Sequence, residues 1–419
     1  MPRLVAVLAL VVVAGIAPVT QETTPARALL ELPQVKAALE AAQRGEARVL
    51  NEQAELSEIP APLMNETRRG EAVRAKFSAL GLLNVRTDAA GNVIGDRPGR
   101  SLHPRLVLAA HLDTVFPEGT DVKTSREGSI LKGPGIADDA RGLAVLLGVA
   151  RALDAGKVQT DGTITFVANV GEEGLGDLRG MKQLFNQTLK GAIDYFVSID
   201  GSGLDVTNVG VGSHRYRVTF KGPGGHSYGD FGLANPIHAL GRLIAQVADF
   251  QVPAEPRTTF NVGRVTGGTS INSIPYLASL EMDMRSVDRG ALDRVDANFR
   301  KAVDRALAEE NARWDNHGRL SVSVDLVGDR PAGRTAEDSF ILREAVGVTR
   351  ALGGVPDLGA GSTDANYPMS LHIPAITIGG GGLAHGVHSL AESFDSTGSW
   401  LGTERALLLA VALATSPGK

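Results

Sequence analysis

Residues 106–113 read LVLAAHLD, a short apolar run that ends in His111 and Asp113. A continuous apolar run of this length is typical of a strand buried on both faces of a parallel sheet. Further along the chain, residues 140–153 carry apolar side chains at helical spacing, and residues 164–170 read ITFVANV. The order strand, helix, strand predicts an α/β domain built on a mostly parallel sheet.

Two more apolar runs, 195–199 and 375–378, complete a set of four predicted strands, and each strand is followed by a histidine or a carboxylate. These following residues are His111 and Asp113, Glu172 and Glu173, Asp200, and finally His385 and His388. Because the carboxyl ends of parallel strands line one edge of a sheet, side chains distant in sequence can converge there. Asp138, which lies just before the predicted helix, is a further candidate.

The composition restricts the chemistry that this edge can carry. The chain has 419 residues and no cysteine, which excludes disulfides, thiolate metal sites and thiol nucleophiles. Its formal net charge of −5 gives no electrostatic argument for binding nucleic acid. Histidines and carboxylates without cysteine suit zinc or a similar divalent ion, and two ions sharing one carboxylate would use the whole set.

Simpler structural interpretations of the same residues remain open at this point. Asp138 and Asp139 could cap the helix that begins at Ala140. Glu172 and Glu173 could form a solvated pair in a loop. The metal-site hypothesis depends on several strands ending in ligand residues at the same edge.

The N-terminus has the composition of a secretory signal peptide. Arg3 precedes an apolar stretch at 4–17, and the chain turns polar from Thr20. We therefore expect residues 1–21 to be a signal peptide and the protein to be secreted or periplasmic, with no membrane span in the mature form. Pro18 directly follows Ala17, so the sequence does not define a clear cleavage site. A retained membrane anchor is therefore the alternative.

The middle of the chain has a different pattern. Residues 277–285 alternate between apolar and charged side chains, as in a strand with one buried face, and helices are predicted at 235–250 and 289–311. We expect residues 211–327 to form an inserted α+β domain. The first domain would then comprise residues 22–210 and 328–419.

Several of these motifs, taken together and in order, resemble the M20 family of metallopeptidases, which includes tripeptidase T, glutamate carboxypeptidase and the aminoacylases. The motifs are AHLDTV at 110–115, GPGIAD at 133–138, GEEG at 171–174, Asp200, GSTDAN at 361–366 and HSLAE at 388–392. The resemblance covers residues 30–415. It implies a catalytic domain like that of the dizinc exopeptidases, with an inserted lid or dimerisation domain. The alternative that GPGIAD is half of a dinucleotide fingerprint is weak, because Asp138 stands where the third glycine should be.

The resemblance also implies how two divalent metal ions would be held. His111 and Asp200 would bind one ion. Glu173 and His388 would bind the other, and Asp138 would bridge both. Zinc is the expected metal, with cobalt or manganese as alternatives.

The same resemblance assigns roles to the residues around the metal ions. Glu172 would be the general base that activates a metal-bridging water, and Asp113 would orient the imidazole of its metal-binding neighbour. His385 competes with His388 for the last metal position. We favour His388 because its spacing to Glu392 matches the family's His-x-x-x-Glu.

In the inserted domain, three residues resemble substrate-binding positions of the family. They are His226 in the GPGGHS loop, Asn272 in the GTSINSIP segment, and Arg285. The resemblance implies that Arg285 binds a substrate carboxylate and that the inserted domain forms a homodimer. Alternatively, His226 is simply an exposed loop residue, and Arg285 forms a salt bridge to Glu281 or Asp283.

The resemblance therefore implies a dimetal-dependent hydrolase that cleaves an amide or peptide bond in a small peptide or N-acyl amino acid. Within hydrolases, the alternative is an aminoacylase or a carbamoyl-type amidohydrolase. A non-catalytic binding protein on the same scaffold is a further alternative, but such a protein is expected to have lost metal ligands.

Overall fold

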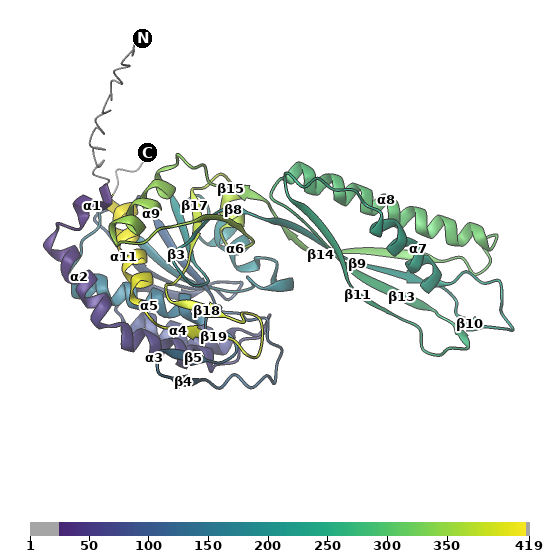
Figure 1. The fold of residues 1–419 in the computed structure, drawn as a ribbon, viewed down its shortest axis with the longest axis horizontal. Helices are drawn as coiled ribbons and strands as arrows, with labels where there is room; N and C mark the ends of the chain where they lie inside the picture. The colour runs from purple at the N-terminus through teal and green to yellow at the C-terminus, as the bar shows by residue number, and fades with distance from the viewer. Residues whose placement is uncertain (1–24, 416–419) are drawn as a thin grey trace, which may run out of the picture.

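The computed structural model describes residues 25–415, which form two parts (Figure 1). The larger part, here called the main unit, is a layered α/β structure made of residues 25–211 and 331–415. The second part, the inserted unit, is a long arm made of residues 212–330. The predicted signal peptide at 1–21 lies outside the described residues. No helix between residues 25 and 415 has the length and apolar character needed to cross a membrane.

A nine-stranded mixed sheet forms the centre of the main unit. Its strands, in spatial order, are β1 (Leu83–Thr87), β2 (Val93–Arg97), β6 (Ile164–Asn169), β3 (Leu106–His111), β7 (Tyr195–Ile199), β17 (Ala375–Ile378), β8 (Val206–Gly210) and β15 (Gly333–Arg334), with β16 (Leu358–Gly361) beside β8. The four predicted strands are β6, β3, β7 and β17, and they are parallel neighbours. The pairs β1–β2, β2–β6, β17–β8 and β8–β15 are antiparallel. The α/β class is thus confirmed, with a parallel centre and mostly antiparallel flanks, where only β16 pairs with β8 in parallel.

Helices cover both faces of this sheet. They are α1 (Pro25–Leu29), α2 (Pro33–Arg44), α3 (Glu46–Ser57), α4 (Thr67–Ala79), α5 (Ala140–Ala155), α6 (Arg179–Gln183), α9 (Phe340–Ala351), α10 (Asn366–Ser370) and α11 (Trp400–Thr415), with short turns η1 (Gly174–Gly176) and η2 (Leu184–Thr188). Leu106 and Leu108 of β3 belong to the core formed with α2, α4, α5, α9 and α11. Val107 and Ala109 belong to a second core formed with α6, η2 and α10. Because both faces are buried, every residue of this strand is apolar until His111.

The inserted unit is an antiparallel sheet covered on one face by two helices (Figure 1). Its strands, in spatial order, are β11 (Thr258–Gly267), β13 (Leu277–Ser286), β9 (Gly212–Lys221) and β14 (Ser321–Arg330), and its helices are α7 (Pro236–Ala248) and α8 (Arg289–Arg313). Leu280, Met282 and Met284 of β13 are buried beneath these helices. The strand β14 continues to Arg330, past the predicted boundary at residue 327.

A small sheet and a short strand pair position segments that contain predicted site residues. The small sheet consists of β18 (Leu383–His385), β19 (Ser393–Asp395), β5 (Ile130–Lys132) and β4 (Ser125–Glu127). At the tip of the inserted unit, β10 (Gly225–His226) pairs with β12 (Ser273–Ile274). Figure 1 places β10 at the far end of the arm.

The guanidinium of Arg141 in α5 ties together distant segments inside the main unit. It is fully buried and donates to Glu46 Oε1 at 2.8 Å, to the carbonyl of Gly380 at 2.8 Å and to that of Ser399 at 2.6 Å. We expect Arg141→Leu to lower the free energy of unfolding by about 3–5 kcal/mol, because the Glu46 carboxylate would remain buried without a positively charged partner. Urea denaturation of the purified variant measures this.

The matched control for that prediction is Arg44→Leu. Arg44 pairs with Glu40 at 3.3 Å, and both side chains are exposed. Because an exposed ion pair contributes little, the expected loss is less than about 1 kcal/mol. Equal losses in the two variants would contradict the importance of the buried contacts.

Candidate active site

The ligand residues predicted from the strand ends meet at one edge of the main sheet. His111 is the last residue of β3, Asp200 follows β7, and Glu173 follows β6. Three groups of three side chains among residues 25–415 have ligand atoms within 4.8 Å of one another, and two of these groups share Asp138. The first group is His111, Asp138 and Asp200, and the second is Asp138, Glu173 and His388. The structure therefore brings all five predicted ligands together, and Asp138 belongs to both groups.

The buried imidazole of His111 is oriented for metal binding. Its Nδ1 lies 3.0 Å from the carbonyl oxygen of Asp113, and since a carbonyl only accepts, Nδ1 carries the proton. Its Nε2 lies 2.9 Å from Asp138 Oδ1. Both of these atoms are buried, and neither has a hydrogen-bond partner among residues 25–415. Two buried ligand atoms this close to each other fit a shared cation.

The carboxylate of Asp113 contacts the main chain of the loop that carries the two predicted glutamates. It accepts hydrogen bonds from the main-chain N–H of Glu172 at 3.1 Å and of Glu173 at 2.8 Å. Its Oδ1 lies 3.8 Å from His111 Nδ1, so the imidazole is held by the Asp113 carbonyl instead. Asp113 thus fixes both the histidine and the loop that carries the two glutamates.

Asp138 lies between the two histidines, in a loop that Glu392 holds. Its Oδ2 is 2.9 Å from His388 Nε2, which is also 3.0 Å from Glu173 Oε1. The buried carboxylate of Glu392 accepts from the N–H groups of Gly135 at 3.0 Å, Ala137 at 2.8 Å and Asp138 at 3.1 Å. The glutamate of the HSLAE motif therefore shapes the loop that presents the shared ligand.

Asp139 and His385, which the alternative interpretations involve, have contacts of their own. Asp139 caps α5, since its carboxylate accepts from Gly142 N at 3.0 Å, and it also accepts from His111 N at 3.0 Å. His385 lies within β18 and pairs with Ser393 of β19. It belongs to neither ligand group.

The electrostatics of the cluster show an excess of negative charge. Burial, reinforced by the charge of Asp138, raises the pKa of Asp200 to about 7. Burial with the charges of Asp138 and Glu172 raises the pKa of Glu173 to about 8. The hydrogen bond to Asp138 is the main cause that raises the pKa of His388 to about 9. Without metal, the raised pKa values mean that these groups retain protons, which offset part of the negative charge of the carboxylates. Bound divalent cations would offset the same negative charge, so the donor set fits such ions.

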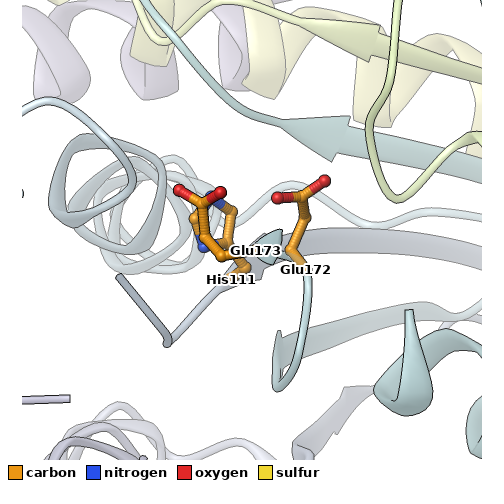
Figure 2. A group of neighbouring side chains, drawn as sticks. All are labelled: His111, Glu172 and Glu173. Carbon is orange, nitrogen blue, oxygen red and sulfur yellow. The ribbon is translucent and has the colours of Figure 1, made fainter. Parts of the chain in front are cut away.

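Glu172 stands beside the ligands without belonging to either of the two groups that share Asp138. Figure 2 shows the carboxylate of Glu172 beside the carboxylate of Glu173 and the imidazole of His111. These three side chains offer ligand atoms within 4.8 Å of one another. Glu172 is buried, and its Oε1 accepts from Arg330 Nη1 at 3.0 Å. Arg330 could not be predicted from the sequence, because it lies 158 residues from Glu172 in a strand without a motif.

The residues predicted to bind substrate lie in two separate places. His226 and Asn272 are neighbours at the tip of the inserted unit, where Ser227 N donates to the carbonyl of Asn272 at 3.0 Å. This tip is far from β3 and β18 of the same chain (Figure 1). The structure therefore does not bring this pair to the metal ligands within one subunit.

Arg285 lies at the opposite end of the arm, near the main unit. Its Nε donates to Asp283 Oδ2 at 2.8 Å, which is the salt bridge considered as the alternative. Arg215 donates to the other oxygen of Asp283 at 2.9 Å and also to the carbonyl of Gly174. Two guanidinium groups therefore share one carboxylate beside the loop that carries Glu172, leaving positive charge there.

Comparison with known proteins places this geometry in a family. Carboxypeptidase G2 of Pseudomonas sp. (strain RS-16) is 29% identical over 322 residues, which cover 73% of this chain and 74% of that protein. A succinyl-diaminopimelate desuccinylase of Corynebacterium glutamicum is 25% identical over 334 residues, covering 78% of this chain and 86% of the relative. A tripeptidase of Staphylococcus aureus has the same fold, with a TM-score of 0.72 at 24% identity, covering 88% of this chain and 99% of that structure.

The sequence pattern described as Peptidase family M20/M25/M40 matches residues 107–411. The match contains the four parallel strands, the inserted unit and both ligand groups. Since it spans most of the chain, this protein belongs to peptidase family M20/M25/M40.

Proposed function

We propose that the protein is a dimetal-dependent hydrolase that cleaves an amide or peptide bond in a small peptide or N-acyl amino acid. The observation that carries this proposal is the pair of ligand groups sharing Asp138, with the carboxylate of Glu172 beside them. His111 and Asp200 would hold one ion, and Glu173 and His388 the other. Bound divalent ions would polarise the scissile carbonyl and lower the pKa of water.

The chain's own residues account for the proton transfers. Glu172 accepts the proton of the attacking water and later delivers it to the departing amine. Arg330 engages one oxygen of this carboxylate, which leaves the other free to accept the proton. Asp113 holds the main chain of both glutamates, so the base keeps its place during turnover.

Zinc is the metal that we propose for both positions, with cobalt and manganese as alternatives. The proposal is supported by a set of imidazole and carboxylate ligands. Metal analysis of the purified protein, followed by reconstitution with each ion, tests it. Fewer than one bound ion per chain would favour a non-catalytic binding protein.

The substrate class is tested by a rate screen. The relatives are named as a carboxypeptidase and as a desuccinylase, names that support hydrolysis of peptides and of acyl amino acids respectively. Dipeptides, tripeptides and N-acyl amino acids should be compared with and without chelator. A preference for N-acyl or N-carbamoyl compounds would favour the aminoacylase or carbamoyl-type alternative. Chelator-resistant cleavage would contradict the proposal.

We propose that Arg285 binds the carboxylate of the substrate. Analogues in which this carboxylate is esterified should therefore react more slowly.

We further propose a homodimer in which His226 and Asn272 complete the site of the other subunit. Their place at the tip of the arm, away from their own metal ligands, supports this arrangement. His226 Nδ1 accepts from the N–H groups of Tyr228 at 3.2 Å and Gly229 at 3.1 Å. The proton is therefore on Nε2, where it could donate to a substrate oxygen.

Subunit mixing tests that dimer. Glu172→Gln and His226→Ala should each be inactive alone. After exchange, the mixture should recover about one quarter of wild-type activity, because half of the dimers are mixed and each has one intact site. As the control, mixing Glu172→Gln with Glu173→Ala should restore nothing. No recovery in the first mixture would place His226 outside the site of a neighbouring subunit.

We also propose that the protein is secreted or periplasmic. The support is the composition of residues 1–21, with Arg3 before the apolar stretch at 4–17. N-terminal sequencing of the protein recovered from the periplasm or medium tests this. A membrane fraction that still begins at Met1 would indicate the retained anchor.

A further inference from the structure

The side chain of Arg330 joins the inserted unit to Glu172. Arg330 is the last residue of β14 and is buried. Its Nη1 donates to Glu172 Oε1 at 3.0 Å and to Ser362 Oγ at 3.2 Å, and its Nη2 donates to the carbonyl of Glu172. One guanidinium from the arm thus holds both the carboxylate and the main chain of the same residue. This two-point contact restricts the rotamer of Glu172 more than a single bond would.

Asn366 fixes the two segments that connect the arm to the main unit. The first connection passes through Val211 and the second through Pro331, the residue after Arg330. The buried amide of Asn366 donates to the carbonyls of Val211 at 2.8 Å and Pro331 at 3.0 Å. Its oxygen accepts from Thr363 N at 3.0 Å. The side chain of Asn366 therefore fixes the main chain of both connections between the arm and the main unit.

Further contacts tie the arm to the same loop that carries Glu172. Asp329 N donates to Asp177 Oδ1 at 2.6 Å, and Lys182 Nζ donates to the carbonyl of Asp329 at 3.1 Å. Arg215 donates to the carbonyl of Gly174. A rotation of the arm about its connections would therefore move groups that hold residues 172–177.

We propose that Arg330 is a positioning residue that couples the orientation of the inserted unit to the carboxylate of Glu172. This inference rests on the proposed role of Glu172 as the general base. We call the orientation of the arm in this structure the seated orientation. In it, Asn366 holds the two connections and Arg330 keeps the carboxylate of Glu172 beside the ligand groups. When the arm turns away, Glu172 loses both contacts, so the base is correctly placed only in the seated orientation.

Steady-state kinetics of the metal-loaded enzyme test this role. Arg330→Ala is expected to lower kcat by about tenfold to hundredfold, because misplacement of a catalytic group by about 1 Å has an effect of this size. KM should change by less than about threefold, since the group positioned is the base and not the substrate. Arg330→Lys and free guanidinium added to Arg330→Ala should each restore part of kcat. Arg334→Ala, an exposed arginine on the same connection, is the matched control and should behave as wild type.

A distance measurement tests the coupling independently of activity. The chain has no cysteine, so Lys190→Cys on the main unit and Lys301→Cys on α8, both exposed, accept spin labels specifically. Double electron-electron resonance, with labelled chains diluted in unlabelled protein, gives the distribution of distances between the units. We expect this distribution to broaden in Arg330→Ala and in Asn366→Ala, while bound metal stays at the wild-type ratio.

The outcomes separate this inference from the proposed function. A rise in KM at unchanged kcat in Arg330→Ala would show that Arg330 binds substrate, and unchanged kinetics or an unchanged distance distribution would also overturn the inference. If Glu172→Gln kept full activity, the proposed function itself would fail. An inactive Glu172→Gln beside a fully active Arg330→Ala would overturn only the coupling. Should Arg330→Ala fold poorly, Arg330→Lys and Asn366→Ala give the same readouts.

Discussion

Glu172→Gln is expected to lower kcat/KM by about 10²- to 10⁴-fold, the range typical of losing a general base. The amide has the same shape as the carboxylate, and its oxygen can still accept from Arg330, but it cannot take a proton at neutral pH. The main-chain contacts to Asp113 do not involve the altered group. Glu172 belongs to the group with His111 and Glu173 but not to the two groups that share Asp138, which we propose as the ion sites, so the metal content should remain at the wild-type value.

The control for this prediction is Glu127→Gln. Glu127 is exposed in β4 and pairs with Lys132 at 2.7 Å, away from the ligand groups. It should retain wild-type kinetics. Metal analysis of both variants shows whether any loss of rate reflects lost ions. Substantial turnover by metal-loaded Glu172→Gln would require another base.

The parallel centre of the fold could be predicted because its strands are buried on both faces. In β3, Leu106 and Leu108 pack on one side while Val107 and Ala109 pack on the other, so the sequence is apolar without interruption. The edge strand β11 could not be found this way. Most of its residues are exposed, and it carries Asn261, Gly263 and Arg264, which give no apolar period.

The ligands of the candidate site were predictable for a related reason. Each follows a recognisable strand or stands before a recognisable helix, so position in the fold and residue type agree. Arg330 and the carboxylate of Asp113 gave no comparable signal. Their contacts, to Glu172 across 158 residues and to the main chain after β6, exist only once the units are packed.

The position of His226 shows a second limit of sequence reasoning. The GPGGHS loop predicts contact with substrate, but the strand lengths of β9 and β13 carry it to the far end of the arm. Each strand has 10 residues, and at about 3.3 Å per residue it extends about 33 Å. The motif predicts the chemistry of the loop, but the lengths of the strands determine which metal ligands the loop can reach.

Removing the metal ions is expected to abolish hydrolysis and to destabilise the fold, increasingly so as the pH rises. Without metal, the folded chain holds protons tightly: the pKa is raised to about 7 at Asp200, about 8 at Glu173 and about 9 at His388. Unfolding returns these groups to about 4 for the carboxyls and about 6.5 for histidine. Stability of the metal-free protein from these groups is therefore greatest below about pH 4 and falls progressively until the pH has passed the raised pKa values of about 7, 8 and 9.

Bound ions reverse this trend, because they require deprotonated ligands and replace the protons. At a free metal concentration about a thousandfold above its dissociation constant, each ion adds about 4 kcal/mol, and that dissociation constant itself falls as protons leave. Calorimetry of metal-loaded and chelated protein should therefore show a difference in Tm that widens from about pH 6 to pH 8.5. Asp200→Asn removes one titrating ligand and should flatten the pH dependence of the chelated protein. Equal Tm values with and without metal at the higher pH would contradict ion binding by these residues, because the excess negative charge would then be tolerated unaided.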